Sequence, residues 1–172
     1  VRPSHELGEK PLRFNWQTPI LLSKHNQDIF YIAANRLYRS LNRGDSLVAV
    51  SADLTNGKVT GNVPYGTITS ISESPLRFGM LYAGTDDGNI QLSRDNGYTW
   101  EKLNASAPAA PAGKKAKAVP ADTRLQTNNL WVSRVIASQH KEGRVYVTLN
   151  GYRSDNFGAY LYMSDDYGKT WK

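Results

Sequence analysis

The sequence predicts an all-β fold, and three observations carry this prediction. The composition favours turns and strands, since the 172 residues include 14 Gly, 10 Tyr and 4 Trp at a mean hydropathy of −0.53. Short stretches rich in Ile, Val, Leu, Tyr and Thr alternate with turn-forming stretches. One pattern of such stretches also occurs three times along the chain. Repeats of four short strands are typical of propeller blades, so we expect a β-propeller of four-stranded antiparallel blades.

The three repeats are recognised by the turn that ends each of them. Ser40, Ser93 and Ser164 open these turns, at spacings of 53 and then 71 residues. The last two turns match S-x-D-x-G-x-T-W in full, whereas the first carries Asn42 in place of the Asp, Ser46 in place of the Thr and Leu47 in place of the Trp. The longer second interval contains two insertions, 105–121 and the residues around 151–158. Without them the period approaches the ~40–50 residues of a blade.

The residues of this turn predict a structural role. Gly permits the positive φ that a tight turn requires, and the Asp carboxylate can accept hydrogen bonds from the amides of the turn. The Trp ring can pack beneath the turn. We therefore expect structural rather than catalytic roles for these residues: Ser93, Asp95, Gly97, Trp100, Ser164, Asp166, Gly168 and Trp171.

The strand-like stretches divide among the repeats in chain order. The first repeat contains strands over 18–23, 29–34, 37–40 and 46–51, and the second over 67–72, 80–85, 89–93 and 99–103. The third contains strands over 131–138, 144–149 and 159–164, and its fourth strand is missing.

This division predicts the domain organisation. We expect an N-terminal extension over 1–11, a first blade with a degenerate turn over 12–53, a second blade over 54–104, a mobile Ala/Pro/Lys-rich loop over 105–129 and a truncated third blade over 130–172. About three blades are fewer than a closed ring usually has. We therefore expect a partial propeller or a fragment, completed by further blades of a parent chain or by self-association through open blade edges.

Composition excludes several functional classes. The chain has no Cys, which removes disulfides, thiol nucleophiles and cysteine-ligated zinc. The net charge is +6, but Lys114, Lys115 and Lys117 lie together in a low-complexity stretch, and the other basic residues are scattered among acids. We therefore expect no nucleic-acid partner. No apolar run approaches the ~20 residues of a membrane-spanning helix, so we expect no membrane partner either.

Up-and-down strands place the connections between second and third strands at the same end as those between successive blades. This end is opposite the repeated turns, and a concave site is expected there. Its aromatic and basic residues suit a sugar, a peptide or a carboxylated ligand. The alternative is that they are hydrated turn residues. The candidate ligand-binding residues are Arg36, Tyr65, Trp131, Arg134, Tyr152 and Arg153.

A catalytic or metal role has weaker support. Asp86, Asp87 and Asp155 are the candidate catalytic carboxylates at this end. The three histidines, His5, His25 and His140, are far apart in the sequence, and the calcium-loop pattern is absent. P-loop, nucleophile-elbow and dinucleotide-binding motifs are also absent. We expect no metal and no cofactor.

The repeated turns, together with 66–75 and 82–88, resemble those of bacterial glycosyl-hydrolase-like proteins with Asp-box (BNR) repeats, which are similar to the sortilin-type propeller family. The resemblance covers the chain from about residue 12 onward, apart from the Ala/Pro/Lys-rich loop. It implies a propeller but does not select an activity, because sialidases, xyloglucan hydrolases, sorting receptors and photosystem assembly factors share the repeat. The Arg-Ile-Pro signature that a sialidase would show is absent.

Two functional hypotheses remain. The favoured one is a non-catalytic binding or scaffold module of a larger exported bacterial protein, periplasmic or extracellular, with a carbohydrate or peptide ligand. The sequence shows no signal-peptide pattern at its start. The alternative is a fragment of a sialidase- or xyloglucanase-like glycoside hydrolase whose catalytic site needs further blades.

Overall fold

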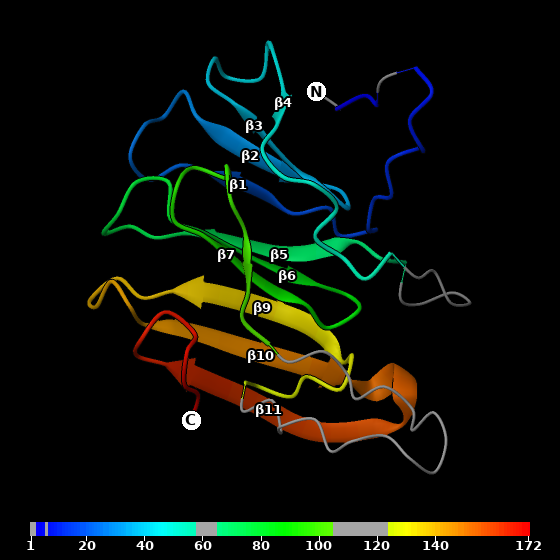
Figure 1. Cartoon of the computed structure of the whole chain (residues 1–172), viewed down its shortest axis with the longest axis vertical. Helices are drawn as coiled ribbons and strands as arrows, with labels where there is room; N and C mark the ends of the chain where they lie inside the picture. The colour runs from blue at the N-terminus through cyan, green and yellow to red at the C-terminus, as the bar shows by residue number, and fades with distance from the viewer. Residues whose placement is uncertain (1–2, 6, 58–64, 105–123) are drawn as a thin grey trace, which may run out of the picture.

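The computed structural model describes residues 3–5, 7–57, 65–104 and 124–172 (Figure 1). Within these residues the protein is all-β, with no α-helix and a single short 3₁₀ helix. The strands form three antiparallel sheets that follow one another along the chain. This confirms the predicted fold class, because the arrangement fits part of a β-propeller.

Each sheet is one blade, and its strands pair in chain order. Blade 1 contains β1 (Ile20–Leu22), β2 (Phe30–Ala33), β3 (Leu37–Ser40) and β4 (Val48–Ala49). Blade 2 contains β5 (Ile68–Glu73), β6 (Leu81–Thr85), β7 (Ile90–Ser93) and β8 (Glu101–Lys102). Blade 3 contains β9 (Trp131–Ala137), β10 (Val145–Gly151), the 3₁₀ helix η1 (Tyr152–Ser154) and β11 (Asn156–Ser164).

The outer strands of blades 1 and 2 are shorter than predicted. The predicted ranges 46–51 and 99–103 reduce to the two-residue strands β4 and β8. The side chains of the turns explain the late start. The amide of Ser46 donates to Asn42 Oδ1 at 3.0 Å, and the amide of Thr99 donates to Asp95 Oδ1 at 2.9 Å. These amides are therefore engaged by the turn instead of the neighbouring strand.

Blade 3 contains a longer hairpin than predicted. β10 continues to Gly151 and β11 begins at Asn156, so half of the predicted insertion at 151–158 is built into the sheet. At the other end of β11, Met163 and Lys172 exchange backbone hydrogen bonds of 3.0 and 2.9 Å. Lys172 therefore occupies the place that Val48 and Glu101 occupy in the other blades, opposite Arg39 and Leu92.

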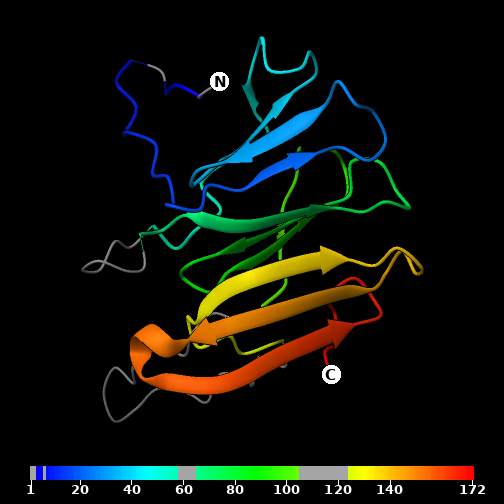
Figure 2. The ribbon, with the colours of Figure 1, turned by 180° about the vertical axis from the view of Figure 1, so that it is seen from behind.

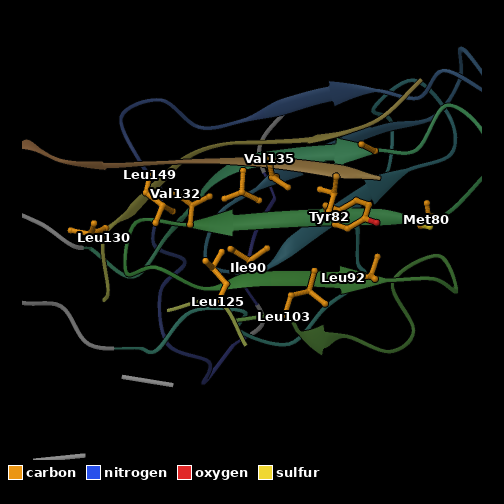
Figure 3. Packing of buried hydrophobic residues seen from close by; sticks show 13 residues of the cluster. Met80, Tyr82, Ile90, Leu92, Leu103, Leu125, Leu130, Val132, Val135 and Leu149 are labelled. Atoms are coloured by element: carbon orange, nitrogen blue, oxygen red, sulfur yellow. The ribbon is translucent and has the colours of Figure 1, made fainter. Parts of the chain in front are cut away.

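The three blades stack side by side, with blade 2 in the middle (Figures 1 and 2). Two cores lie between them. One joins blade 1 to blade 2 around Tyr31, Leu37, Ile68 and Leu81. The larger one joins blade 2 to blade 3 around residues that include Tyr82, Val132 and Val135 (Figure 3). Leu21 packs against the core between blades 1 and 2, so the exposed side chains of Ile20 and Leu22 on the same strand point to the other face of blade 1.

Polar contacts support the packing of β5 against β9. The amides of Val135 and Ala137 donate to the hydroxyls of Ser70 and Ser72, both at 3.0 Å. Gly84 allows the close approach, because a Cβ there would lie 2.4 Å from Val132 Cγ1. Small and hydroxyl side chains on the middle blade therefore determine how near blade 3 can come.

The predicted mobile loop over 105–129 needs a correction at its end. Residues 105–123 lie outside the described part of the chain, but residues 124–129 pack against blade 2. Leu125 joins the larger core and forms a parallel bridge with Asn104. Thr127 is buried, and its hydroxyl donates to the Gly88 carbonyl at 2.8 Å. The burial of Leu125 and the hydrogen bond of the Thr127 hydroxyl explain why residues 124–129 pack against blade 2.

Candidate functional site

Two kinds of chain connection meet at one end of the blades, which we call the connection end. It holds the β2–β3, β6–β7 and β10–β11 connections and the residues that lead into β1, β5 and β9. Asp86 joins two of these connections, because its carboxylate accepts the amides of Tyr65 at 2.8 Å and Thr67 at 2.9 Å. In blade 1, Asn35 Oδ1 accepts the amide of Arg13 at 3.1 Å in the same way. The predicted meeting of these connections is therefore present.

Asp86 and Asp87, two of the candidate catalytic carboxylates, lie inside the protein instead of in an open funnel. They are 2% and 4% exposed. Asp87 accepts the Thr85 hydroxyl at 2.6 Å and the Asn56 amide at 2.7 Å. Burial raises the pKa of Asp87, and these hydrogen bonds oppose the shift. Both carboxylates form hydrogen bonds to turn residues inside the protein. The expectation that they face a ligand is therefore corrected.

Three predicted ligand-binding residues come together at the connection end of blade 3. The Arg153 guanidinium lies 4.8 Å from the ring centroid of Trp131 and 5.4 Å from that of Tyr152. Its Nε also donates to the Tyr152 hydroxyl at 2.8 Å. We call these three residues the aromatic–arginine cluster. Tyr152 is 53% exposed, so the cluster is open to solvent.

Local structure positions this cluster. Trp131 opens β9, opposite Asn150 of β10. Asn150 Oδ1 accepts the Tyr152 amide at 3.0 Å, which begins the 3₁₀ turn that carries Tyr152 and Arg153. Asp155 ends this turn in the left-handed conformation, with a φ of 53°. Asp155, the third candidate carboxylate, is exposed and acts here as a turn residue.

The other predicted ligand-binding residues have separate surroundings. Arg36 forms a 3.2 Å ion pair with Glu9. Arg134 is exposed on β9, where it lies opposite Thr148. Tyr65 lies beside Asp86, bonded through its backbone amide. Within the described residues, none of these three forms a hydrogen bond or an ion pair with the aromatic–arginine cluster.

Some residues of the connection end were missed at the sequence level. Arg13 forms a 2.6 Å ion pair with Asp53 and donates to the Gly66 carbonyl at 3.0 Å, so it joins blade 1 to the start of blade 2. Burial acts to raise the pKa of Asp53, but hydrogen bonds from Thr55 and Arg13 lower it below its ordinary value. The contacts span 40 and 53 residues, and no local motif signals them. Phe157, 80% exposed beside η1, was also missed.

The three repeated turns lie at the opposite end and share one hydrogen-bond pattern. Ser93 Oγ donates to Asp95 Oδ1 at 2.8 Å and accepts the Gly97 amide at 2.8 Å. Ser164, Asp166 and Gly168 repeat this pattern at the same two distances. The first turn keeps it with Ser40, Asn42 and Gly44, at 3.0 and 2.8 Å. The amide oxygen of Asn42 therefore replaces the carboxylate as an acceptor.

The hydrogen bonds of these turns also stabilise the ionised form of the Asp95 and Asp166 carboxylates. Hydrogen bonds from the backbone and the hydroxyl of Thr170 lower the pKa of Asp166 to about 2. Hydrogen bonds from Thr99 lower the pKa of Asp95 in the same way.

Across the described ranges, no three His, Asp or Glu side chains gather in a way that could hold a metal ion. The same ranges contain no helix that is long and apolar enough to cross a membrane.

Comparison with known proteins identifies structural neighbours only. No family model matches the chain, and no curated protein matches it. Solved structures do match. An ancestral GH74 enzyme gives a TM-score of 0.60 at 14% identity, covering 95% of this chain and 18% of that chain. The GH74 xyloglucanase from Xanthomonas campestris gives 0.55 at 17% identity, covering 94% and 21%.

A third neighbour is YCF48 bound to D1 peptide, with a TM-score of 0.50 at 13% identity, covering 99% of this chain and 46% of that chain. The chain thus spans between about a fifth and just under half of the length of these neighbours. At such identities the similarity shows the fold alone, and these β-propeller proteins agree with the stacked blades.

Proposed function

We propose that this chain is a binding part of a β-propeller, and that its ligand, a carbohydrate or a peptide, contacts the aromatic–arginine cluster. The observation that carries the proposal is the position of the Arg153 guanidinium against the rings of Trp131 and Tyr152. Aromatic rings stack on the apolar faces of sugars and peptide side chains. An Arg held against rings can still direct its remaining donors to a carboxylate or carbonyl.

The carboxylates favour binding over catalysis. Glycoside hydrolysis generally uses two carboxylates about 5–10 Å apart on either side of the bond. Of the three candidates, Asp86 and Asp87 are buried and hold turns, which leaves Asp155 exposed. The alternative is that the chain is part of a glycoside hydrolase whose catalytic site needs further blades. The similarity to GH74 enzymes, of which the chain covers about a fifth, supports that alternative.

We further propose that the three repeated turns are Asp boxes of the bacterial BNR-repeat type, related to the sortilin-type propellers. Their common hydrogen bonds to Asp95, Asp166 and Asn42 support this identification. On the basis of this identification we also propose that the protein acts in the periplasm or outside the cell. The exposed β1 side chains Ile20 and Leu22 suit a neighbouring blade, from the parent chain or from a second copy.

Binding can be tested by calorimetry with two panels, xyloglucan-type and acidic oligosaccharides on one side and short peptides on the other. Trp131→Ala and Arg153→Ala should each weaken binding of the same ligand about tenfold, because a stacked ring contributes ~1–2 kcal/mol. Phe78→Ala is the matched control, since Phe78 is a half-exposed aromatic on the β5–β6 turn at the opposite end. Equal loss in the control would contradict the proposed position.

The same panels separate binding from hydrolysis. A binding protein leaves the oligosaccharides intact, as judged by the release of reducing ends. Turnover that disappears in Asp155→Asn, with folding unchanged, would replace the binding proposal with the glycosidase alternative. If the wild-type chain binds none of the sugars and none of the peptides, the proposal fails.

A further inference from the structure

Trp131 and Arg134 lie on the same face of blade 3, the face that points away from blade 2. Val132 is buried in the core between the two blades, so the neighbouring side chain of Trp131 points to the other face. Three residues along a regular strand would bring Arg134 to the buried face, but Ser133 is an extra residue in β9, and Arg134 pairs with Thr148. The side chains of Trp131 and Arg134 therefore occupy successive positions on one face, roughly 7 Å apart. We call this face the outer face of blade 3.

Two guanidinium groups on this face have no anionic partner. Arg153 lies against the rings of Trp131 and Tyr152, and within the described residues its side chain forms one hydrogen bond, from Nε to the Tyr152 hydroxyl. Arg134 is exposed, and its side chain forms neither a hydrogen bond nor an ion pair with a described residue. Asp155, two residues from Arg153, pairs with neither arginine. The outer face thus carries two positive charges that a ligand can neutralise.

The contacts of Arg153 favour an anion over a neutral sugar. One face of each ring is turned to the guanidinium, at 4.8 Å for Trp131 and 5.4 Å for Tyr152, and that face is not available for a sugar. The Nη groups of Arg153 can instead donate two parallel hydrogen bonds to a carboxylate. Because the rings hold the guanidinium in place, less side-chain freedom is lost when the carboxylate binds.

Blade 2 shows that this part of the outer face is not shaped for a further blade. β5 has the same irregularity as β9, and there Ser70 lies opposite Gly84. These small residues let blade 3 come close, since Ser70 accepts the Val135 amide and a Cβ on Gly84 would lie 2.4 Å from an atom of blade 3. Arg134 and Thr148 occupy the same two positions in blade 3. An arginine there prevents an equally close approach and leaves the face open to a smaller ligand.

Beyond Arg134 the outer face becomes apolar. Ile136 is the next outward residue of β9 and is 49% exposed, and Leu161 of β11, opposite Thr148, is 67% exposed. Along β9 the face therefore presents a positive charge beside Trp131, a second one at Arg134 and then an apolar side chain. Alternate side chains of an extended peptide lie on one face at the same spacing of roughly 7 Å.

We propose that the outer face of blade 3 binds an extended peptide with acidic, acidic and apolar side chains at alternate positions. The proposal rests on the proposed function, in which the aromatic–arginine cluster binds a ligand, and it selects an acidic peptide as that ligand. One carboxylate accepts hydrogen bonds from the Nη groups of Arg153, and the other accepts them from Arg134. The apolar side chain packs against Ile136 and Leu161.

The probe is the blocked peptide acetyl-Glu-Ser-Glu-Ser-Leu-amide, and its neutral counterpart has Gln in place of both Glu. Calorimetry with the full chain should show binding of the acidic peptide, and the neutral peptide should bind about tenfold or more weakly because both charge-assisted contacts are lost. Arg134→Gln and Arg153→Gln should each weaken binding of the acidic peptide about fivefold. Binding should also weaken as NaCl is added, since both arginines are exposed.

Arg43→Gln is the matched control, because Arg43 is an exposed arginine on the first repeated turn, at the opposite end of the blades. It should leave binding unchanged, and circular dichroism verifies that all three variants fold. The acidic-peptide proposal is overturned if the neutral peptide binds equally well, if Arg134→Gln binds like the wild type, or if oligogalacturonate binds more tightly than the peptide.

The outcomes also separate this proposal from the proposed function. If a neutral sugar or peptide binds, and Trp131→Ala weakens it while Arg134→Gln does not, the acidic-peptide proposal fails and the aromatic–arginine cluster remains a binding site. If neither the acidic peptide nor any sugar or peptide of the two panels binds, both proposals fail.

Discussion

The indole nitrogen of Trp100 donates to the carbonyl oxygen of Val50 at 3.0 Å, which bonds the turn of blade 2 to the outer strand of blade 1. The same nitrogen also donates to the Gly97 carbonyl at 3.1 Å, within its own turn. Trp171 has only the equivalent intra-turn bond, to Gly168 at 3.0 Å, among the described residues. Trp100 therefore bonds two blades together through its indole nitrogen, whereas the indole nitrogen of Trp171 bonds within its own turn.

Trp100→Phe should destabilise the protein more than Trp171→Phe. Both changes keep an aromatic ring and remove the indole donor, but only Trp100→Phe leaves the Val50 carbonyl without this partner. We expect a loss of about 1–2 kcal/mol in the free energy of unfolding for Trp100→Phe and roughly half of that for Trp171→Phe. Urea unfolding measures both. Equal losses would mean that the bond to Val50 contributes nothing.

Gly97→Ala should be among the most damaging glycine substitutions. Gly97 has a φ of +92°, and a Cβ there would lie 2.6 Å from the Val50 carbonyl oxygen. Gly57→Ala is the control, because Gly57 has a φ of +71° with nothing within 4 Å of its Cβ position. Backbone strain alone should cost the control ~1 kcal/mol, and the clash should at least double this for Gly97→Ala. Similar thermal midpoints for the two variants would refute the close contact.

The repeated turns should contribute to the acid sensitivity of the protein. The pKa of Asp166 is about 2 in the folded protein, below the ~3.9 of an unfolded Asp, so the folded state binds this proton less readily. The stabilisation is complete above about pH 4 and is lost as the pH falls toward 2. Asp166→Asn should therefore flatten the dependence of stability on pH in this window.

Asp166→Asn should still form its turn, because Asn42 already serves as the acceptor in the first turn. Asp166→Ala provides the comparison, since it removes the acceptor altogether. Chemical denaturation at pH 2, 3, 4 and 6 gives the profile. A wild-type slope retained in Asp166→Asn would assign the acid sensitivity to other carboxylates.

Asp86→Ala should unfold the connection end without a direct effect on a ligand. The change leaves the buried amides of Tyr65 and Thr67 without their acceptor, which costs roughly 2–4 kcal/mol. Asp155→Ala, at an exposed turn position, should cost less than about 1 kcal/mol. Thermal unfolding measures both variants. A stable Asp86→Ala variant with altered ligand binding would restore Asp86 as a candidate for the site.

The sequence predicts this fold well because its signals are local. β3 has the predicted ends, 37 to 40, since a strand bounded by two turns is specified by its immediate neighbours. The repeated turn is likewise complete within eight residues, from Ser93 to Trp100. The start of β8 was predicted too early because Asp95 engages the Thr99 amide, and the hairpin of β10 and β11 was predicted too short because its strands continue into 151 and 156–158.

The candidate site was harder to predict because its determinants are remote. Asp-Asp-Gly is a common surface turn, and the burial of Asp86 depends on partners 19 and 21 residues away. The contact between Trp131 and Arg153 was not predictable either, because it requires the continuation of β10 to Gly151 and the 3₁₀ turn that follows. Composition supplied the candidate residues, whereas packing decided which of them meet.

The equal spacing of the outer strand pairs bears on the order of folding. Arg39 pairs with Val48, Leu92 with Glu101 and Met163 with Lys172, so each corner closes a loop of the same short length. The contacts of β5 with β9, such as that of Ser70 with Val135, span 65 residues. Because loop closure is slower and costs more entropy over long separations, we expect the corners to form before the blades dock. Pulse-labelled hydrogen exchange would then protect the amide of Gly97 earlier than that of Val135.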